Sequence, residues 1–192
     1  AFAAAAGRVR RGTTDALGER PTGATVIQSG DFSASTGWTL SGSGGASATI
    51  AGGLLKLSSA PLGGLAYAEQ LVLVAPADGG VVHALRISIP DDKGPVLLKV
   101  GSSSDDDDYI DATLLGPGEH SLSFTPTVNF YVRFETRLRR EVQVTSCTIE
   151  AAGTMELTNP YAAGDLPYLR FTQSADVIYI AGTHKYQRPI AT

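Results

Sequence analysis

The sequence predicts an all-β protein built around an antiparallel β-sandwich of the jelly-roll kind. Strand-like runs recur about every 8–12 residues between turn clusters from Ala24 to Ala152. Most of these runs alternate apolar and polar residues, the period of a half-buried strand. The 22 Gly and 10 Pro among 192 residues supply the turns that short connections between strands need.

The expected strands follow one another as short runs bounded by Gly, Pro or Asp. Gly52-Gly53 predicts a hairpin turn, and alternation after it places Leu55 and Leu57 on one face with Lys56 on the other. The runs are GWTLSG, SATIAG, LLKLSS, LAYAEQLVLV, VVHALRISI, PVLLKVGS, DYIDATLL, HSLSFT, FYVRFET and EVQVTSCTIE. Two packed antiparallel sheets are their simplest arrangement.

The composition narrows the classes of function. With 43% hydrophobic and 18% charged residues the chain is expected to be globular. A net charge of −4 provides no global attraction to nucleic acid or to an anionic membrane. No apolar run approaches the roughly 18 residues of a membrane helix, so no membrane insertion is expected. The single Cys147 cannot form an internal disulfide and is expected to be a small buried hydrophobe.

Motifs of catalysis are missing from the sequence. His83, His120 and His184 lie in separate runs, and none has a Cys or His partner at metal-ligand spacing. No serine lies in a G-x-S-x-G elbow, and no glycine-rich phosphate cradle is present. We therefore expect a protein that is not an enzyme, with no catalytic residue, no cofactor and no metal site.

Two charged clusters have both a structural and a functional interpretation. The stretch SSSDDDDYID places Asp105 to Asp108 around a turn, but Gly116 stands where the EF-hand pattern needs Glu. A solvated hairpin tip is expected, and calcium binding is left open. The stretch VRFETRLRRE concentrates Arg133 and three further arginines around an expected turn. That turn is either solvated or an interface, with candidate contacts at Arg137, Arg139 and Arg140.

The order of runs between GDFSASTGWTLSG and VTSCTIEAAG resembles the sandwiches of carbohydrate-binding modules over about 130 residues. In such folds a Gly-Trp after an Asp-Phe segment begins a core strand, which implies that Trp38 and Phe32 lie inside. A sugar site usually includes an exposed aromatic side chain. The candidate glycan contacts are Tyr67, Tyr109 and Tyr131.

The stretch NPYAAGDLPYLRFTQSADVIYIAGTHKYQRP, from Asn159 to Pro189, resembles a segment of phage tail proteins. The similar proteins are the nozzle, or tubular tail component, of short-tailed phages and related gene-transfer particles, where the segment opens a propeller-like β body. The turn after the strand departs from the family pattern and keeps His184, Arg188 and Pro189 in looser form. The resemblance implies a chain that continues at both ends. It divides the residues into an N-terminal segment (1–23), the sandwich (24–152), and a short helix with strands that open the propeller-like domain (153–192).

Within this stretch the residues themselves suggest structural roles. Asp165 is expected to cap a short helix whose first turn carries Pro167. Gln173, Ser174 and Asp176 are expected to satisfy backbone groups at the entry to VIYIA, a run that suits a doubly buried strand. Without neighbours, this run would present a long unpaired edge. Arg170 belongs to the same motif.

The resemblance implies a structural component of a virion tail that assembles as a homo-oligomeric ring. Its partners would be other tail proteins and copies of itself. DNA would pass through the channel without sequence recognition, and the sandwich would bind a host surface glycan or a neighbouring tail protein. The alternative is a secreted or surface carbohydrate-binding module.

Overall fold

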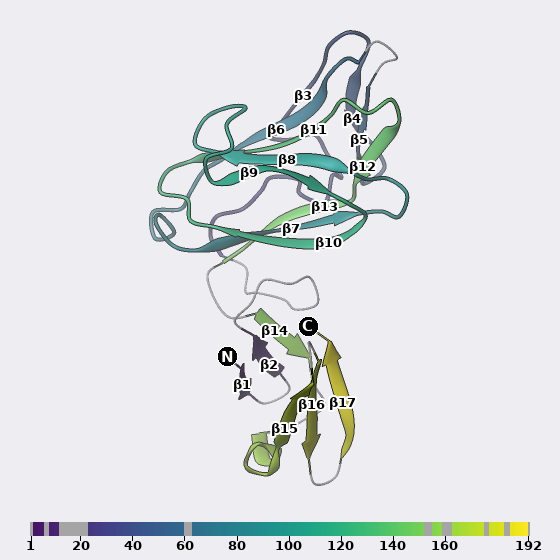
Figure 1. The fold of residues 1–192 in the computed structure, drawn as a ribbon. Coiled ribbons are helices and arrows are strands. Elements are labelled where there is room, and N and C mark those ends of the chain that lie inside the picture. Colours follow the sequence, from purple (N-terminus) through teal and green to yellow (C-terminus); the bar gives the residue numbers. More distant parts are fainter. Residues whose placement is uncertain are drawn as a thin grey trace. The chain divides into compact units, whose positions relative to one another are not determined.

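The structure is a computed structural model that describes residues 2–5, 8–11, 23–59, 63–151, 155–158, 163–174, 177–182 and 185–191. The chain divides into two compact units (Figure 1). One comprises Pro21–Ala152, and the other combines Ala1–Arg20 with Gly153–Thr192. Except for one short 3-10 helix, every regular element in the described ranges is a β-strand.

The unit Pro21–Ala152 is an antiparallel β-sandwich, which confirms the predicted fold class. Its five-stranded sheet has the order β3 (Trp38–Gly42), β6 (Ala66–Val72), β11 (Phe130–Thr136), β8 (Val96–Gly101) and β9 (Ile110–Leu115). The facing sheet is β10 (Gly118–Phe124), β7 (His83–Ile89) and β13 (Ser146–Glu150). At one end lies a third sheet, of β12 (Glu141–Val144), β5 (Leu55–Ser58) and β4 (Ser47–Ile50) (Figure 1).

The predicted Gly-Gly hairpin is present between β4 and β5. Gly52 and Gly53 have φ angles of 64° and 72°, and the Ala51 amide donates to the Leu54 carbonyl at 3.0 Å. Two successive positive φ values define the turn whose twist matches paired strands, and glycine adopts them without a steric penalty. This turn sets the register of β4 and β5, in which Ile50 lies opposite Leu55.

One predicted run divides into two strands of different sheets. EVQVTSCTIE breaks at Thr145, which separates β12 from β13. The Thr145 amide and hydroxyl both donate to the Ser88 carbonyl, at 2.9 and 3.1 Å, so the backbone is fixed at the point where it changes sheets. The alternating pattern of the run does not reveal this break.

The core lies between the sheets and contains the residues that alternation assigns to it. Phe32 is fully buried and Trp38 is 7% exposed. The Trp38 ring lies 5.4 Å from Phe32 and 6.0 Å from Phe134, centroid to centroid. The indole nitrogen donates to the Gln28 carbonyl at 3.0 Å, so the polar atom of this large apolar side chain is paired. Cys147 is also fully buried, as expected.

In the second unit, strands from both ends of the chain form one sheet. Its order is β1 (Phe2–Ala5), β2 (Arg8–Arg11) and β14 (Met155–Thr158). β2 and β14 are antiparallel, with Arg11 opposite Met155. The sandwich is therefore inserted in the sequence between two strands that are direct neighbours in a sheet.

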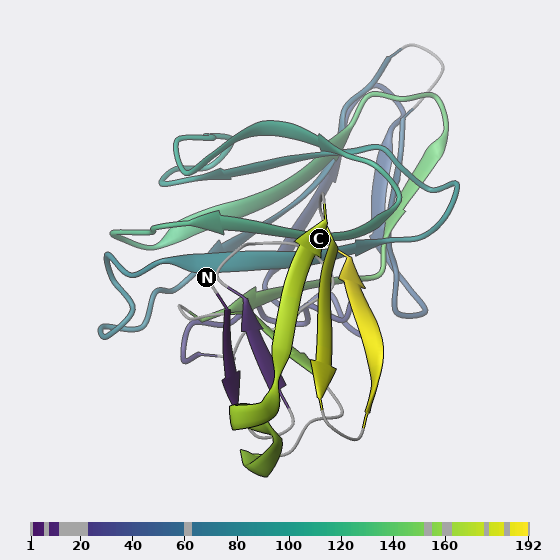
Figure 2. The same ribbon diagram turned by 60° about the horizontal axis from the view of Figure 1, so that its bottom comes forward.

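The rest of this unit is a 3-10 helix, η1 (Ala163–Tyr168), and a sheet of β15 (Arg170–Ser174), β16 (Val177–Gly182) and β17 (Lys185–Ala191). Figure 2 shows these C-terminal strands in yellow-green to yellow and the N-terminal strands in purple. The run VIYIA does have neighbours within the chain, because β16 is the middle strand and pairs with both β15 and β17. The sequence KYQRPIA does not suggest a strand because of Pro189, which an edge strand tolerates.

The helix prediction needs one correction. η1 begins at Ala163, so Asp165 lies in its first turn rather than before it, and Pro167 lies inside it. A 3-10 helix this short has few interior amide bonds for a proline to remove. Arg170, Gln173 and Ser174 lie on β15. Asp176 is outside the described residues, and the structural role predicted for this motif stays a prediction.

Candidate functional site

The outer face of the five-stranded sheet carries charged side chains in adjacent cross-strand rows. In β11, Arg133 and Glu135 alternate with the core residues Val132 and Phe134, so they point away from the core. Backbone pairing places them in two rows across the strands, one of Thr39, Glu69, Arg133 and Lys99, the other of Ser41, Tyr67, Glu135, Leu97 and Leu114.

These charges form an ion-pair network that is largely removed from water. Arg133 Nε lies 2.9 Å from Glu135 Oε2, and Arg133 Nη1 lies 3.4 Å from Glu69 Oε1. Arg133 is 5% exposed, and Glu69 and Glu135 are each 7% exposed. The guanidinium also stacks on the Tyr67 ring, 3.7 Å from its centroid. The sequence suggests that Arg133 lies near a turn, whereas it occupies the middle of a strand.

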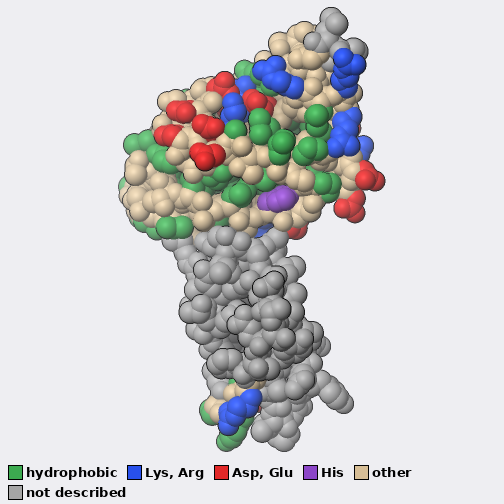
Figure 3. Space-filling view, in the orientation of Figure 1, with side chains coloured by type: hydrophobic (Ala, Val, Ile, Leu, Met, Phe, Trp, Pro, Cys, Tyr) green, Lys and Arg blue, Asp and Glu red, His purple; other side chains and the backbone are tan. Residues whose placement is uncertain are grey.

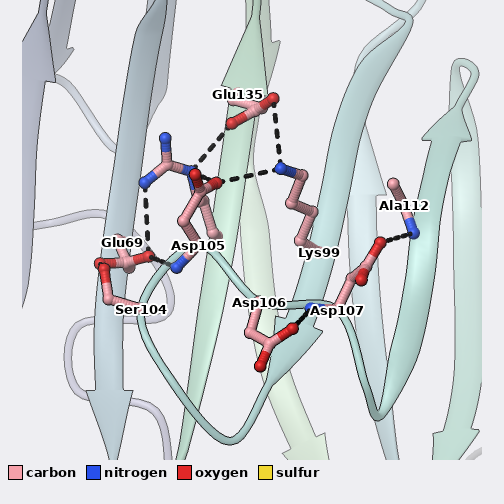
Figure 4. Close-up of polar contacts among 9 residues, drawn as sticks. Glu69, Lys99, Ser104, Asp105, Asp106, Asp107, Ala112 and Glu135 are labelled. Carbon is pink, nitrogen blue, oxygen red and sulfur yellow. Dashed lines mark hydrogen bonds and ion pairs between the residues drawn. The ribbon is translucent and has the colours of Figure 1, made fainter.

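The loop between β8 and β9 covers this network (Figure 4). Asp105 Oδ1 lies 3.0 Å from Lys99 Nζ and 3.2 Å from Arg133 Nε. The Asp105 amide donates to Glu69 Oε1 at 3.0 Å, and the Ser104 hydroxyl donates to Glu69 Oε2 at 2.7 Å. Two consecutive loop residues therefore supply a carboxylate, a hydroxyl and an N–H to side chains on three strands.

Electrostatics favour the charged forms of Asp105 and Arg133. The hydrogen bond from Lys99, assisted by the charges of Arg133 and Lys99, holds the pKa of the Asp105 carboxyl below its ordinary value. Burial is the largest influence on Arg133 and lowers the pKa of its guanidinium. The hydrogen bond to Glu135 and the charges of Asp105, Glu135 and Glu69 together reverse this and raise that pKa.

The other three aspartates of the loop hold its backbone. Asp106 Oδ1 accepts from the Asp107 amide and Asp107 Oδ2 from the Ala112 amide, both at 3.0 Å. Asp108 accepts from the Ser102 amide at 2.6 Å and from the Ser102 hydroxyl at 2.9 Å. Within the described ranges, no group of three or more His, Cys, Asp or Glu is placed to hold a metal ion. The stretch predicted as a solvated hairpin tip joins the paired strands β8 and β9 with Asp105, Asp106 and Asp108 exposed, and internal hydrogen bonds hold its backbone.

An aliphatic groove of about 280 Å³ begins beside Glu135. It is lined by Pro95, Leu97, Leu114, Glu135, Thr136, Arg137 and Leu138. In Figure 3 the same face shows acidic side chains gathered on one side and apolar ones next to them. Leu114 is 65% exposed and Leu138 39% exposed, so the groove is open to solvent.

The three arginines predicted as an interface lie in the exposed loop that joins β11 to β12. Arg137 lines the groove, and the Arg140 side chain donates to the Gly94 carbonyl. Arg139 is exposed. Their proposed contact to another protein stays a prediction.

The structure separates the three candidate tyrosines. Tyr67 and Tyr131 are half-buried on the outer face, on neighbouring strands. Tyr109 lies elsewhere, because its ring packs 6.4 Å from the core residue Phe124 and its hydroxyl bonds to Thr127 Oγ1 at 3.0 Å. The predicted contact of these three tyrosines with a glycan stays a prediction.

Sequence reasoning missed Glu69, Lys99 and Glu135. Their signal is present as charged residues at alternate positions of three strand-like runs, which places each on the solvent side of its strand. What the sequence does not contain is the pairing that brings them into adjacent rows.

The two described histidines have structural contacts. His83 is 1% exposed, its Nδ1 lies 2.7 Å from the Val81 carbonyl oxygen, and its Nε2 lies 3.7 Å from Asp78 Oδ2. His120 Nε2 lies 2.8 Å from the Gly116 carbonyl oxygen. His184 is outside the described residues.

In the part of the chain that the structure describes, no helix is long and apolar enough to cross a membrane. No protein-family model matches the chain, and no curated protein matches it. Among solved structures, one similar chain is the enzymatically active domain of tailspike protein 4 of bacteriophage CBA120, with a TM-score of 0.46 and 14% sequence identity. The match covers 65% of this chain and 21% of that one.

Proposed function

We propose that this chain is part of a tail structural protein of a short-tailed phage or a related particle, as a component of its nozzle. The sandwich is then a binding domain inserted into that protein, and its ligand is a host surface glycan. The protein acts by assembly and binding rather than by catalysis. Two sources support this: the tail-protein resemblance of Asn159 to Pro189, and the insertion of the sandwich between β2 and β14.

The pairing of β2 with β14 carries the proposal. One strand of this sheet precedes the sandwich in the sequence and its neighbour follows it. The sheet can therefore form with the sandwich inserted, and the inserted domain can have a separate role. The outer face of the five-stranded sheet provides fixed carboxylates, a guanidinium and two tyrosines, which are groups that bind hydroxyl-rich ligands.

Excision of the sandwich from the full-length protein tests both parts of the proposal. Arg11 and Met155 are direct partners, so a short Gly-Ser linker can replace residues 12–154, because paired Cα atoms lie about 5 Å apart. We expect particles that still contain the shortened protein and adsorb poorly to the host. Loss of the protein from otherwise complete particles contradicts the tail role, whereas normal adsorption contradicts the binding role.

A secreted or surface carbohydrate-binding module is the second candidate, favoured by the shared outer face of Tyr67 and Tyr131. It predicts that the native protein is absent from purified particles and binds polysaccharide without other tail components. Immunodetection in purified particles separates the two candidates.

A further inference from the structure

We infer that Lys99 and Arg133 form a carboxylate subsite in which Asp105 is an internal stand-in for the ligand, a hydroxylated carboxylic acid such as a uronic acid residue. This inference rests on the proposed glycan-binding role of the sandwich and names the chemical class of its ligand. The site is the ion-pair network on the outer face together with the loop Ser102–Asp108.

The loop presents the groups of such a ligand. Asp105 gives a carboxylate to Lys99 Nζ and Arg133 Nε, at 3.0 and 3.2 Å. Next to it, the Ser104 hydroxyl donates to Glu69 Oε2 at 2.7 Å. A sugar acid also carries a carboxylate beside hydroxyl donors, and so it can replace both contacts without leaving Arg133 or Glu69 unpaired.

The receiving side chains are fixed, whereas the stand-in is exposed. Arg133 and Glu69 are held on central strands, with side chains 6% and 9% exposed. The Asp105 side chain is 58% exposed and belongs to a run of four aspartates. Its release would return one carboxylate to water and relieve repulsion within the loop, while Glu69 and Glu135 still balance the charges of Arg133 and Lys99 and the incoming carboxylate takes the place of Asp105 beside them.

The groove provides space for the rest of the ligand. Glu135 belongs both to the ion-pair network and to the groove lining. Leu97 and Leu114 continue the Glu135 row across β8 and β9, and their aliphatic surface can contact the C–H face of a sugar ring. A carboxylate at Lys99 and a neighbouring unit in the groove therefore share one continuous surface.

Because Asp105 competes with the ligand for Lys99 and Arg133, its removal should raise the affinity of the site for the ligand. The apparent affinity of a ligand that must displace an internal group equals its affinity for the open site multiplied by the fraction of molecules in which the site is open. If the loop is closed in about 90% of molecules or more, removal of the Asp105 carboxylate raises the affinity for a free sugar acid about tenfold or more.

The test titrates the chain with D-glucuronate and follows the side-chain NMR signals of Arg133 and Lys99. Asp105→Gly removes the carboxylate and suits the φ of 67° at this position. Asp92→Gly is the matched control, because Asp92 is an exposed aspartate with a φ of 62° in a different turn. We expect roughly tenfold tighter binding or better for Asp105→Gly, no change for Asp92→Gly, and no binding of neutral D-glucose by either.

Equal affinity of wild type and Asp105→Gly, or equal binding of glucose, overturns the inference. Asp105→Asn, which removes the charge while retaining a side chain of similar shape, repeats the test if the glycine variant loses its folded spectrum. Adding Lys99→Met to Asp105→Gly should abolish the gain. If glucuronate binding fails while sandwich-deleted particles still lose adsorption, the ligand class is wrong and the proposed function stands. If glucuronate binds as expected while those particles adsorb normally, the subsite is supported and the proposed binding role is wrong.

Discussion

The burial and the ion-pair partners of a charged residue that alternates with core residues in a strand are determined by the neighbouring strands. Arg133 is buried because Tyr67 and Glu69 lie beside it on β6, Lys99 on β8, and a loop closes over it. The core residues Val132 and Phe134 on either side of it are predictable from alternation alone. Its partners are not, because the pairing of strands far apart in sequence is not encoded in any one run.

Loss of Arg133 should therefore destabilise the fold strongly. Arg133→Met leaves the buried carboxylates of Glu69 and Glu135 without their main partner, and we expect a loss of about 3 kcal/mol in the free energy of unfolding. Arg139→Met, the same substitution at an exposed position in the next loop, should change it by less than about 0.5 kcal/mol. Urea denaturation of both variants measures this, and equal effects would contradict the buried network.

Asp108 should make the loop sensitive to acid. Hydrogen bonds from the Ser102 amide, and secondly from its hydroxyl, lower the pKa of this carboxyl below its ordinary value of 3.8. The folded-state pKa is depressed, so the stabilisation is complete above 3.8 and is lost as the pH falls through the folded-state pKa. Carboxyl NMR titration should give a midpoint below 3.8 that rises partway in Ser102→Ala and stays unchanged in Ser103→Ala. An unshifted midpoint in the wild type would refute the contact.

At the scale of elements, the sequence predicts strands better than it predicts what joins them. The Gly-Gly hairpin is readable because two adjacent glycines have few structural alternatives. The change of sheet at Thr145 is not, because it depends on the carbonyl of Ser88 on another strand. The exposed tip Ser102–Asp108 is predictable from its sequence, but its contacts with Glu69 and Arg133 are not, since those residues are distant along the chain.

The hairpin offers a clean measure of backbone strain. A Cβ at Gly52 would meet no atom within 4 Å, so Gly52→Ala adds only the penalty of a left-handed φ of 64°, about 1 kcal/mol of stability. Gly52→Asn should be less costly, because Asn tolerates this conformation. Gly116→Ala is the control, since Gly116 also has open space but no positive φ, and thermal unfolding should show it near wild type. An equal decrease at both glycines would rule out the strain argument.

At the scale of the whole molecule, the inserted sandwich should be self-sufficient. Among the described residues, every member of its hydrophobic core lies between Ile27 and Ile149, within the one unit. Its length of about 130 residues is in the range where one core supports a stable domain. The second unit is not one continuous stretch of the sequence. Its strands β2 and β14 must come together across the whole insert before their sheet can form.

Residues 21–152 expressed alone should consequently unfold in one cooperative transition, at the same urea midpoint as the corresponding transition of the 192-residue chain. Trp38 fluorescence reports this transition selectively, because it is the single Trp and lies in the sandwich core. Iodide should quench it weakly in both proteins.

Residues 1–20 joined by a short linker to 153–192 provide the reciprocal measurement, in which β2 and β14 can pair without waiting for the sandwich. Faster protection of their amides from hydrogen exchange than in the full chain is expected, since the loop to be closed is shorter. A midpoint for the isolated sandwich that falls well below that of the chain would mean that the sandwich depends on the unit into which it is inserted.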